Sequence, residues 1–135
     1  MRQIALALTV ITLLVVAAMP LMAHHSFAAE FDSKKQVTLT GYLTKVEWTN
    51  PHVWFYMDVK DESGKTTNWG FEMGPPHLLQ GQGWTRNLMK LGDQFTVNGA
   101  VAKNGANRVN ARSVLTKEGK KLGAASSEGQ VQVQP

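Results

Sequence analysis

The stretch VWFYMDVKDESGKTTNWGFEM, residues 53–73, decides the fold of this chain. In its first part apolar side chains occupy every second position, and polar or large aromatic ones lie between them. A period of two predicts a half-buried strand, because successive side chains point to opposite faces. The expected inner face carries Val53, Phe55, Met57 and Val59. The expected outer face carries Trp54, Tyr56 and Asp58.

The polar segment DESGK (61–65) is rich in turn-forming residues and is expected to close a hairpin. In the returning strand, residues 66–73, the side chains of Trp69, Phe71 and Met73 share one face. The two strands therefore predict an antiparallel pair whose inner face contributes to a core.

Three further segments show the same alternation. Residues 36–48 change phase in their second half, which predicts a β-bulge, and Gly41 supplies backbone freedom for a sharp bend. Residues 94–101 and 108–116 are also typical of strands. An Asn-Gly pair lies between them and favours a tight hairpin turn.

Between the third and fourth expected strands, residues 74–93 lose the alternation. Pro75 and Pro76 suit the start of a short helical turn, and Thr85 suits the cap of another. Five strands with a long bent first strand and a helix after the third predict an all-β, OB-like barrel over residues 36–117. A generic five-stranded sandwich and an open meander are the alternatives.

The chain also resembles a group of small exported bacterial proteins known as a domain of unknown function. The motifs that carry the resemblance are AHHSFAAEFD, TKVEWTNPHVW, NWGFEMG, GWTRN, LGDQFTVNGAVAKNG and NARSV. They cover nearly all of residues 23–116. The resemblance implies an exported OB-like domain and implies no particular activity.

Residues 1–23 have the pattern of a secretory signal, with Arg2 before the apolar run Ile4–Ala18. The run is shorter than the roughly 20 residues of a spanning helix, so membrane contact is expected only through an uncleaved signal. Cleavage after Ala23 would expose a histidine pair at the new amino terminus. Cleavage after Ala28 fits the small-residue rule better and would remove both histidines. A periplasmic or secreted location is expected in either case.

The rest of the chain divides into an N-terminal arm (24–35), the barrel (36–117) and a small, polar tail (118–135) that is expected to be disordered. The net charge is +4 and the basic residues are scattered, which argues against nucleic-acid binding. There is no cysteine, so neither a disulfide nor a thiolate metal ligand is available.

The outer face of the central hairpin carries the candidate ligand-binding residues. The alternation places His52, Trp54 and Tyr56 on this face in one strand, and Asn68 and Glu72 in the other. In one interpretation the two rings stack on a saccharide, a base or a peptide, and the polar side chains hydrogen-bond it. The carboxylate of Glu72 is expected to be solvated.

A second interpretation covers the same rings with another part of the chain. The segment SFAAEF (26–31) can form one helical turn with Phe27 and Phe31 on the same side. If both docked over Trp54 and Tyr56, each would contribute about 1.5–3 kcal/mol of apolar burial. A contact with a second copy of the chain is the third interpretation.

His24 and His25 are a candidate metal site, with His52 as a third ligand. An amino-terminal histidine chelates through its amine and Nδ1, and a further imidazole would complete a set of nitrogen donors. Such donors suit copper, nickel and zinc, and copper has the highest affinity. The alternative is a pair of exposed polar residues, because no CxxC, HxxxH or carboxylate triad accompanies them.

Arg86, in the motif GWTRN (83–87), is expected to brace the helical turn or to line an anion pocket. No Ser–His–Asp arrangement and no phosphate-binding loop can be identified, so an enzyme is not expected. The first functional hypothesis is an exported binding or accessory module that holds a transition metal through His24, His25 and His52. The alternative is an interaction module that binds a saccharide, a peptide or another protein on its outer aromatic face.

Overall fold

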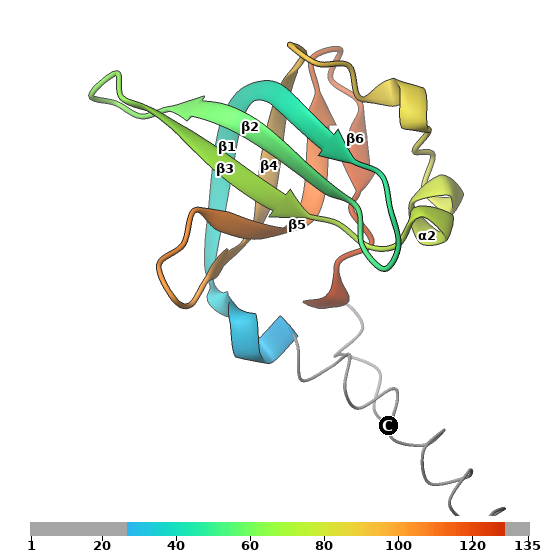
Figure 1. Ribbon diagram of the computed structural model, residues 1–135, viewed down its shortest axis with the longest axis horizontal. Helices are drawn as coiled ribbons and strands as arrows, with labels where there is room; N and C mark the ends of the chain where they lie inside the picture. The colour runs from blue at the N-terminus through green and yellow to red at the C-terminus, as the bar shows by residue number, and fades with distance from the viewer. Residues whose placement is uncertain (1–26, 129–135) are drawn as a thin grey trace, which may run out of the picture.

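The computed structural model describes residues 27–128, and this part of the chain is mostly β (Figure 1). Two short helices, α2 (Pro76–Gly81) and the 3-10 helix η1 (Arg86–Leu88), lie between the third and fourth strands, and residues 27–30 are also helical. The strands are β1 (Phe31–Glu47), β2 (Trp54–Lys60), β3 (Thr66–Glu72), β4 (Gln94–Ala102), β5 (Arg108–Thr116) and β6 (Lys121–Gly123). None of the helices in the described range is long and apolar enough to cross a membrane.

The central hairpin forms as the alternation predicts. β2 and β3 pair antiparallel with no register shift, and Phe55 lies opposite Phe71. In the turn, one carboxylate oxygen of Asp61 accepts hydrogen bonds from the backbone N–H groups of Ser63 and Lys65, at 2.9 and 3.0 Å. Gly64 completes the turn with φ of +85°, a conformation that side chains disfavour.

β1 is long because it serves two neighbours, with its first half paired to β4 and its second half to β2. The register with β2 shifts between Leu43 and Lys45, which confirms the expected bulge. Gly41 is required at the crossing, since a Cβ there would lie 2.5 Å from the backbone oxygen of Asp58. The bend therefore depends on a close approach that no other residue allows.

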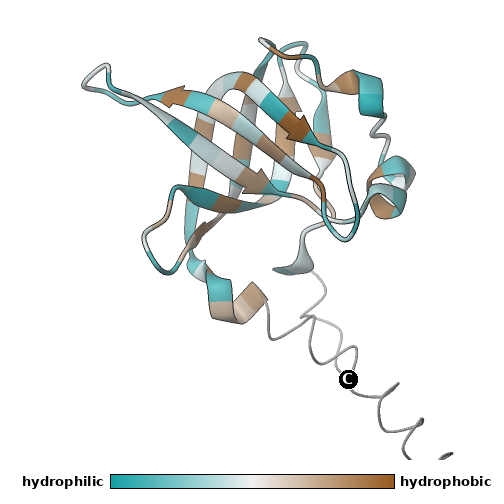
Figure 2. Cartoon of the chain, in the orientation of Figure 1, coloured by the Kyte–Doolittle hydropathy of each residue, from teal (hydrophilic) through white to brown (hydrophobic). Residues whose placement is uncertain are grey.

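The sheet order is β3-β2-β1-β4-β5-β6, and β3 also pairs with β5 in parallel. This second pairing joins Gly70–Glu72 to Arg108–Asn110. As a result, the strands from β1 to β4 each have two hydrogen-bonded neighbours, and β5 has three, namely β3, β4 and β6. Figure 2 shows apolar and polar residues alternating along the strands, as expected for a wall with one buried face.

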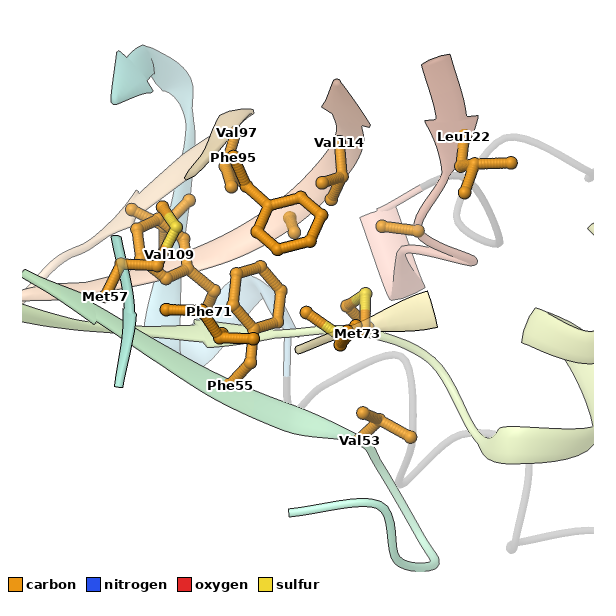
Figure 3. Close-up of a cluster of buried hydrophobic side chains, with 14 of the residues drawn as sticks. Val53, Phe55, Met57, Phe71, Met73, Phe95, Val97, Val109, Val114 and Leu122 are labelled. Carbon is orange, nitrogen blue, oxygen red and sulfur yellow. The ribbon is translucent and has the colours of Figure 1, made fainter. Parts of the chain in front are cut away.

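The core lies between the β2–β3 hairpin and the β4–β5 pair (Figure 3). The rings of Phe55 and Phe71 stack with their centroids 5.0 Å apart. Trp84 is 1% exposed, and its indole N–H donates to the backbone oxygen of Gly123 at 2.7 Å. The other fully buried large side chains are Leu43, Met57, Met73, Leu79, Val53, Val97, Val109, Val114 and Asn110.

Three expectations about element boundaries need correction. β1 begins at Phe31, so the last residues of the expected arm (24–35) belong to the strand. The expected disorder of residues 118–135 is wrong for the described part, because β6 pairs with β5 and the side chain of Leu122 is buried. Thr85 precedes η1, but its side chain makes no capping hydrogen bond. β6 was not expected because a strand of three residues with one buried apolar side chain is too short to show a period of two.

Candidate functional site

His52 and Glu72 form the most distinctive polar pair among the described residues. His52 lies in the turn before β2, after a cis Asn50–Pro51 bond, and Glu72 ends β3. The Nδ1 atom of His52 is 2.5 Å from Oε1 of Glu72. The side chain of His52 is 37% exposed, whereas that of Glu72 is only 10% exposed. The pair therefore presents an imidazole to the surface and keeps its carboxylate partner inside.

Glu72 is buried, contrary to the expectation that it is solvated. Burial raises the pKa of its carboxyl above the ordinary value, and the neighbouring Glu30 acts in the same direction. The charge of His52 and hydrogen bonds from His52 and Asn110 act in the opposite direction. Burial is the largest of these causes, because a carboxylate in a low-dielectric environment loses its hydration.

A cavity of about 250 Å³ adjoins this pair. Its walls include Phe27, Phe31, Pro51 and Ser127 as well as His52 and Glu72. The cavity thus combines an apolar wall from the start of the described chain with a polar wall from the β2–β3 hairpin.

The expected intramolecular cap is present over one of the two aromatic rings. Phe27 and Phe31 are 5% and 3% exposed, and their ring centroids are 5.8 Å apart. Together with Ala100 they form a small second core, against which Trp54 packs. The guanidinium of Arg108 lies 5.4 Å from the centre of the Trp54 ring. The phenylalanine rings and the Arg108 guanidinium of the same chain therefore lie against the indole of Trp54.

Tyr56 lies outside that second core and has partners of its own. Its hydroxyl donates to Oε2 of Glu47 at 3.2 Å, and Nζ of Lys45 lies 5.3 Å from its ring centre. Lys45 and Glu47 also form an ion pair at 2.5 Å, which lowers the pKa of Glu47 and raises that of Lys45. A Cβ on Gly70 would lie 3.2 Å from the Tyr56 ring, so aromatic rings fill the space beside this glycine.

The remaining expected ligand-binding residues lie apart from the cavity. The amide of Asn68 donates to Asp58 at 2.8 Å and to Thr44 at 3.1 Å, on the exposed part of the hairpin. Arg86 donates to the backbone oxygen of Trp48 at 3.4 Å, which agrees with a bracing role. The structure therefore brings His52 and Glu72 together beside the phenylalanines against which Trp54 packs, and leaves Asn68 and Arg86 elsewhere.

The other two expected metal ligands, His24 and His25, lie outside the described residues. Within residues 27–128 there is no group of three or more His, Cys, Asp or Glu side chains that could hold a metal ion. A metal at His52 would therefore need donors from beyond this range.

Two residues of the site were missed by the sequence reasoning. Arg108 and Asn110 reach Trp54 and Glu72 because β5 pairs with β3, an arrangement that strand periodicity does not reveal. The one available signal is the polar Asn110 between two apolar neighbours in the fifth strand.

No curated protein and no solved structure matches the chain significantly. A family of unknown function, DUF6152, matches residues 11–112 and thus most of the sequence, including all three histidines of the candidate metal site and all of β1, β2 and β3. This chain belongs to the DUF6152 family of unknown function.

Proposed function

We propose that this protein is an exported OB-like barrel that binds a transition metal, copper in the first place, through His24, His25 and His52. The barrel assignment is supported by the circuit of pairings β1–β2–β3–β5–β4–β1, with a short helix between β3 and β4. Export is supported by the charged and apolar pattern of residues 1–23.

The observation that carries the metal proposal is that Phe27 and His52 line the same cavity. His24 precedes Phe27 by three residues, which can span at most about 10 Å of extended chain. The histidine pair is therefore within reach of His52. A cut after Ala28 would discard Phe27, whose side chain is 5% exposed, so its burial favours the cut after Ala23.

The His52–Glu72 pair has the chemistry of a supported metal ligand. Histidine ligands commonly donate one ring N–H to a carboxylate, which fixes the tautomer and leaves the other nitrogen for the metal. Here Oε1 of Glu72 pairs with Nδ1 of His52, so Nε2 is the ring nitrogen left to bind the metal. The donors would then be the amine and imidazoles of the mature amino terminus and Nε2 of His52. The amine of a free amino terminus titrates at about pH 8, so a metal can displace its proton under ordinary conditions.

The proposal is tested on the exported, processed chain. Intact-mass measurement establishes whether His24 is the first residue, and copper(II) is then titrated against a competing chelator. We expect His52→Ala and the double variant His24→Ala/His25→Ala each to bind copper at least tenfold more weakly than the wild type. His77→Ala, a histidine on α2 that does not line the cavity, is the matched control and should bind as the wild type does. Equal affinity for all four proteins would refute the proposal.

A further inference from the structure

Asn110 is a buried amide that neither the strand pattern nor the proposed function uses. It is 2% exposed and lies in β5, opposite Glu72 in the parallel pairing with β3. Hydrogen bonding from Asn110 to the Glu72 carboxyl lowers the pKa of that carboxyl and opposes the effect of burial. The buried amide of Asn110 therefore lies next to the Glu72 carboxylate, which in turn pairs with His52.

Two serines after β6 hydrogen-bond this amide and hold it in place. The hydroxyl of Ser126 donates to Oδ1 of Asn110 at 2.5 Å, and Nδ2 of Asn110 donates to the hydroxyl of Ser127 at 3.3 Å. With Oδ1 toward Ser126, the N–H groups of the amide face Ser127 and Glu72, and Glu72 requires this orientation because its carboxylate only accepts hydrogen bonds. A flipped amide would place its oxygen against the carboxylate of Glu72, and two acceptors would then face each other with no donor between them.

Residues 124–128, here called the C-terminal strap, are fixed beside the cavity. The backbone N–H of Gly74 donates to the oxygen of Ala124 at 2.9 Å. A Cβ on Gly74 would lie 2.6 Å from the Cβ of Ala125, so the strap crosses this glycine in direct contact. Ala125 has φ of +48° and is the one non-glycine residue with positive φ in the described part of the chain. Such a conformation persists where the surroundings over-determine it.

We propose that Asn110 is a positioning residue held by the C-terminal strap, and that it fixes the Glu72 carboxylate as the acceptor for the Nδ1–H of His52. The strap contributes Ala125 and Ser127 to the wall of the cavity that His52 and Glu72 also line, so it lies in the same site. The effect on metal affinity rests on the proposed function. The effect on the His52 tautomer does not, because it concerns the metal-free protein.

The tautomer is read from nitrogen chemical shifts of the His52 ring in the metal-free, full chain at a pH where imidazole is neutral. We expect the wild type to carry its proton on Nδ1. In Asn110→Leu, and in the double variant Ser126→Ala/Ser127→Ala, the proton should redistribute toward Nε2. Ser113→Ala, on the outer side of β5, is the control and should leave the ring signals unchanged. If Asn110→Leu does not fold, the double serine variant decides.

Copper(II) affinity is measured on the same proteins. Loss of an outer partner of a histidine ligand typically weakens binding 10- to 100-fold, and we expect about tenfold for the strap variant. Unchanged ring shifts in both site variants would overturn the positioning role, whatever the metal data. A tautomer that responds to the variants in a protein that binds no copper would support the positioning role and refute the proposed function alone.

Discussion

Replacing Phe27 with alanine tests whether the N-terminal cap is an integral part of the fold. Phe27 is 5% exposed, stacks on Phe31 with centroids 5.8 Å apart, and adjoins Ala100 and Trp54. Deleting a ring from an enclosed core costs about 3–5 kcal/mol. This cluster lies at the start of the described chain and beside a half-buried indole, so its neighbours can close on the space. We therefore expect a loss of about 1.5–3 kcal/mol in the free energy of unfolding, the value for burying one such side chain.

The assay is urea denaturation of the processed chain, followed by tryptophan fluorescence. The midpoint should fall, and the slope should change little, because the surface exposed on unfolding is nearly the same. Leu91→Ala is the matched control: its side chain is 68% exposed. It should change stability by less than about 0.5 kcal/mol. If Phe27→Ala lowered the free energy of unfolding as little as Leu91→Ala, the cap would not be docked in solution. The argument that Phe27 places the histidine pair within reach of His52 would then fail.

Three further predictions concern the stability of the β fold. Trp84→Phe removes the part-buried hydrogen bond to the Gly123 oxygen, so thermal unfolding should show a loss of about 0.5–1.5 kcal/mol; an unchanged midpoint would contradict this. Gly41→Ala forces a Cβ against the backbone oxygen of Asp58, and should cost about 1–3 kcal/mol or more in urea denaturation, whereas a neutral effect would show that the bend in β1 is not tight. Hydrogen bonds from Ser63, Lys65 and Gly64 hold the pKa of Asp61 in the folded protein below its ordinary value of 3.8. The ionised Asp61 therefore stabilises the fold above pH 3.8, and this stabilisation is lost as the pH falls through the lower pKa of the folded state. The stability difference between the wild type and Asp61→Asn should therefore be constant at neutral pH and shrink in acid; a difference that grows in acid would reverse the sign.

Strand existence, the inner and outer faces of the hairpin, and the bulge in β1 could all be predicted, because each is a local consequence of period-two alternation. Val53, Phe55, Met57 and Val59 are buried and Asp58 is exposed, as the pattern requires. The succession of the first five strands along the chain, with helical turns between the third and the fourth, was also accessible from the turn signals.

The environment of the candidate site could be predicted only in part. Phe27 and Phe31 dock where the helical spacing suggested, but on Trp54 and not on Tyr56. Glu72 was placed correctly on the outer face and yet is buried, because the N-terminal segment and β5 cover that end of the hairpin. Burial on an outer face depends on which segments meet there, and strand periodicity does not contain that information.

β6 and the strap after it were missed for a related reason. The segment consists mostly of small and polar residues. It is ordered because of a few long-range contacts, such as the burial of Leu122 in the core and the hydrogen bond from Ser126 to Asn110. Composition predicts disorder when a segment can bury little apolar surface by itself. Here one buried leucine and a set of hydrogen bonds to the rest of the sheet are sufficient.

The central claim, that His52 and the mature amino terminus bind one copper ion together, is tested most directly by electron paramagnetic resonance of the copper(II)-loaded processed protein. We predict nitrogen couplings from the amino terminus and from imidazole, and the loss of one imidazole coupling in His52→Ala while the amine coupling is retained. A spectrum that is identical in the wild type and in His52→Ala would contradict the claim, because the copper would then be held without His52.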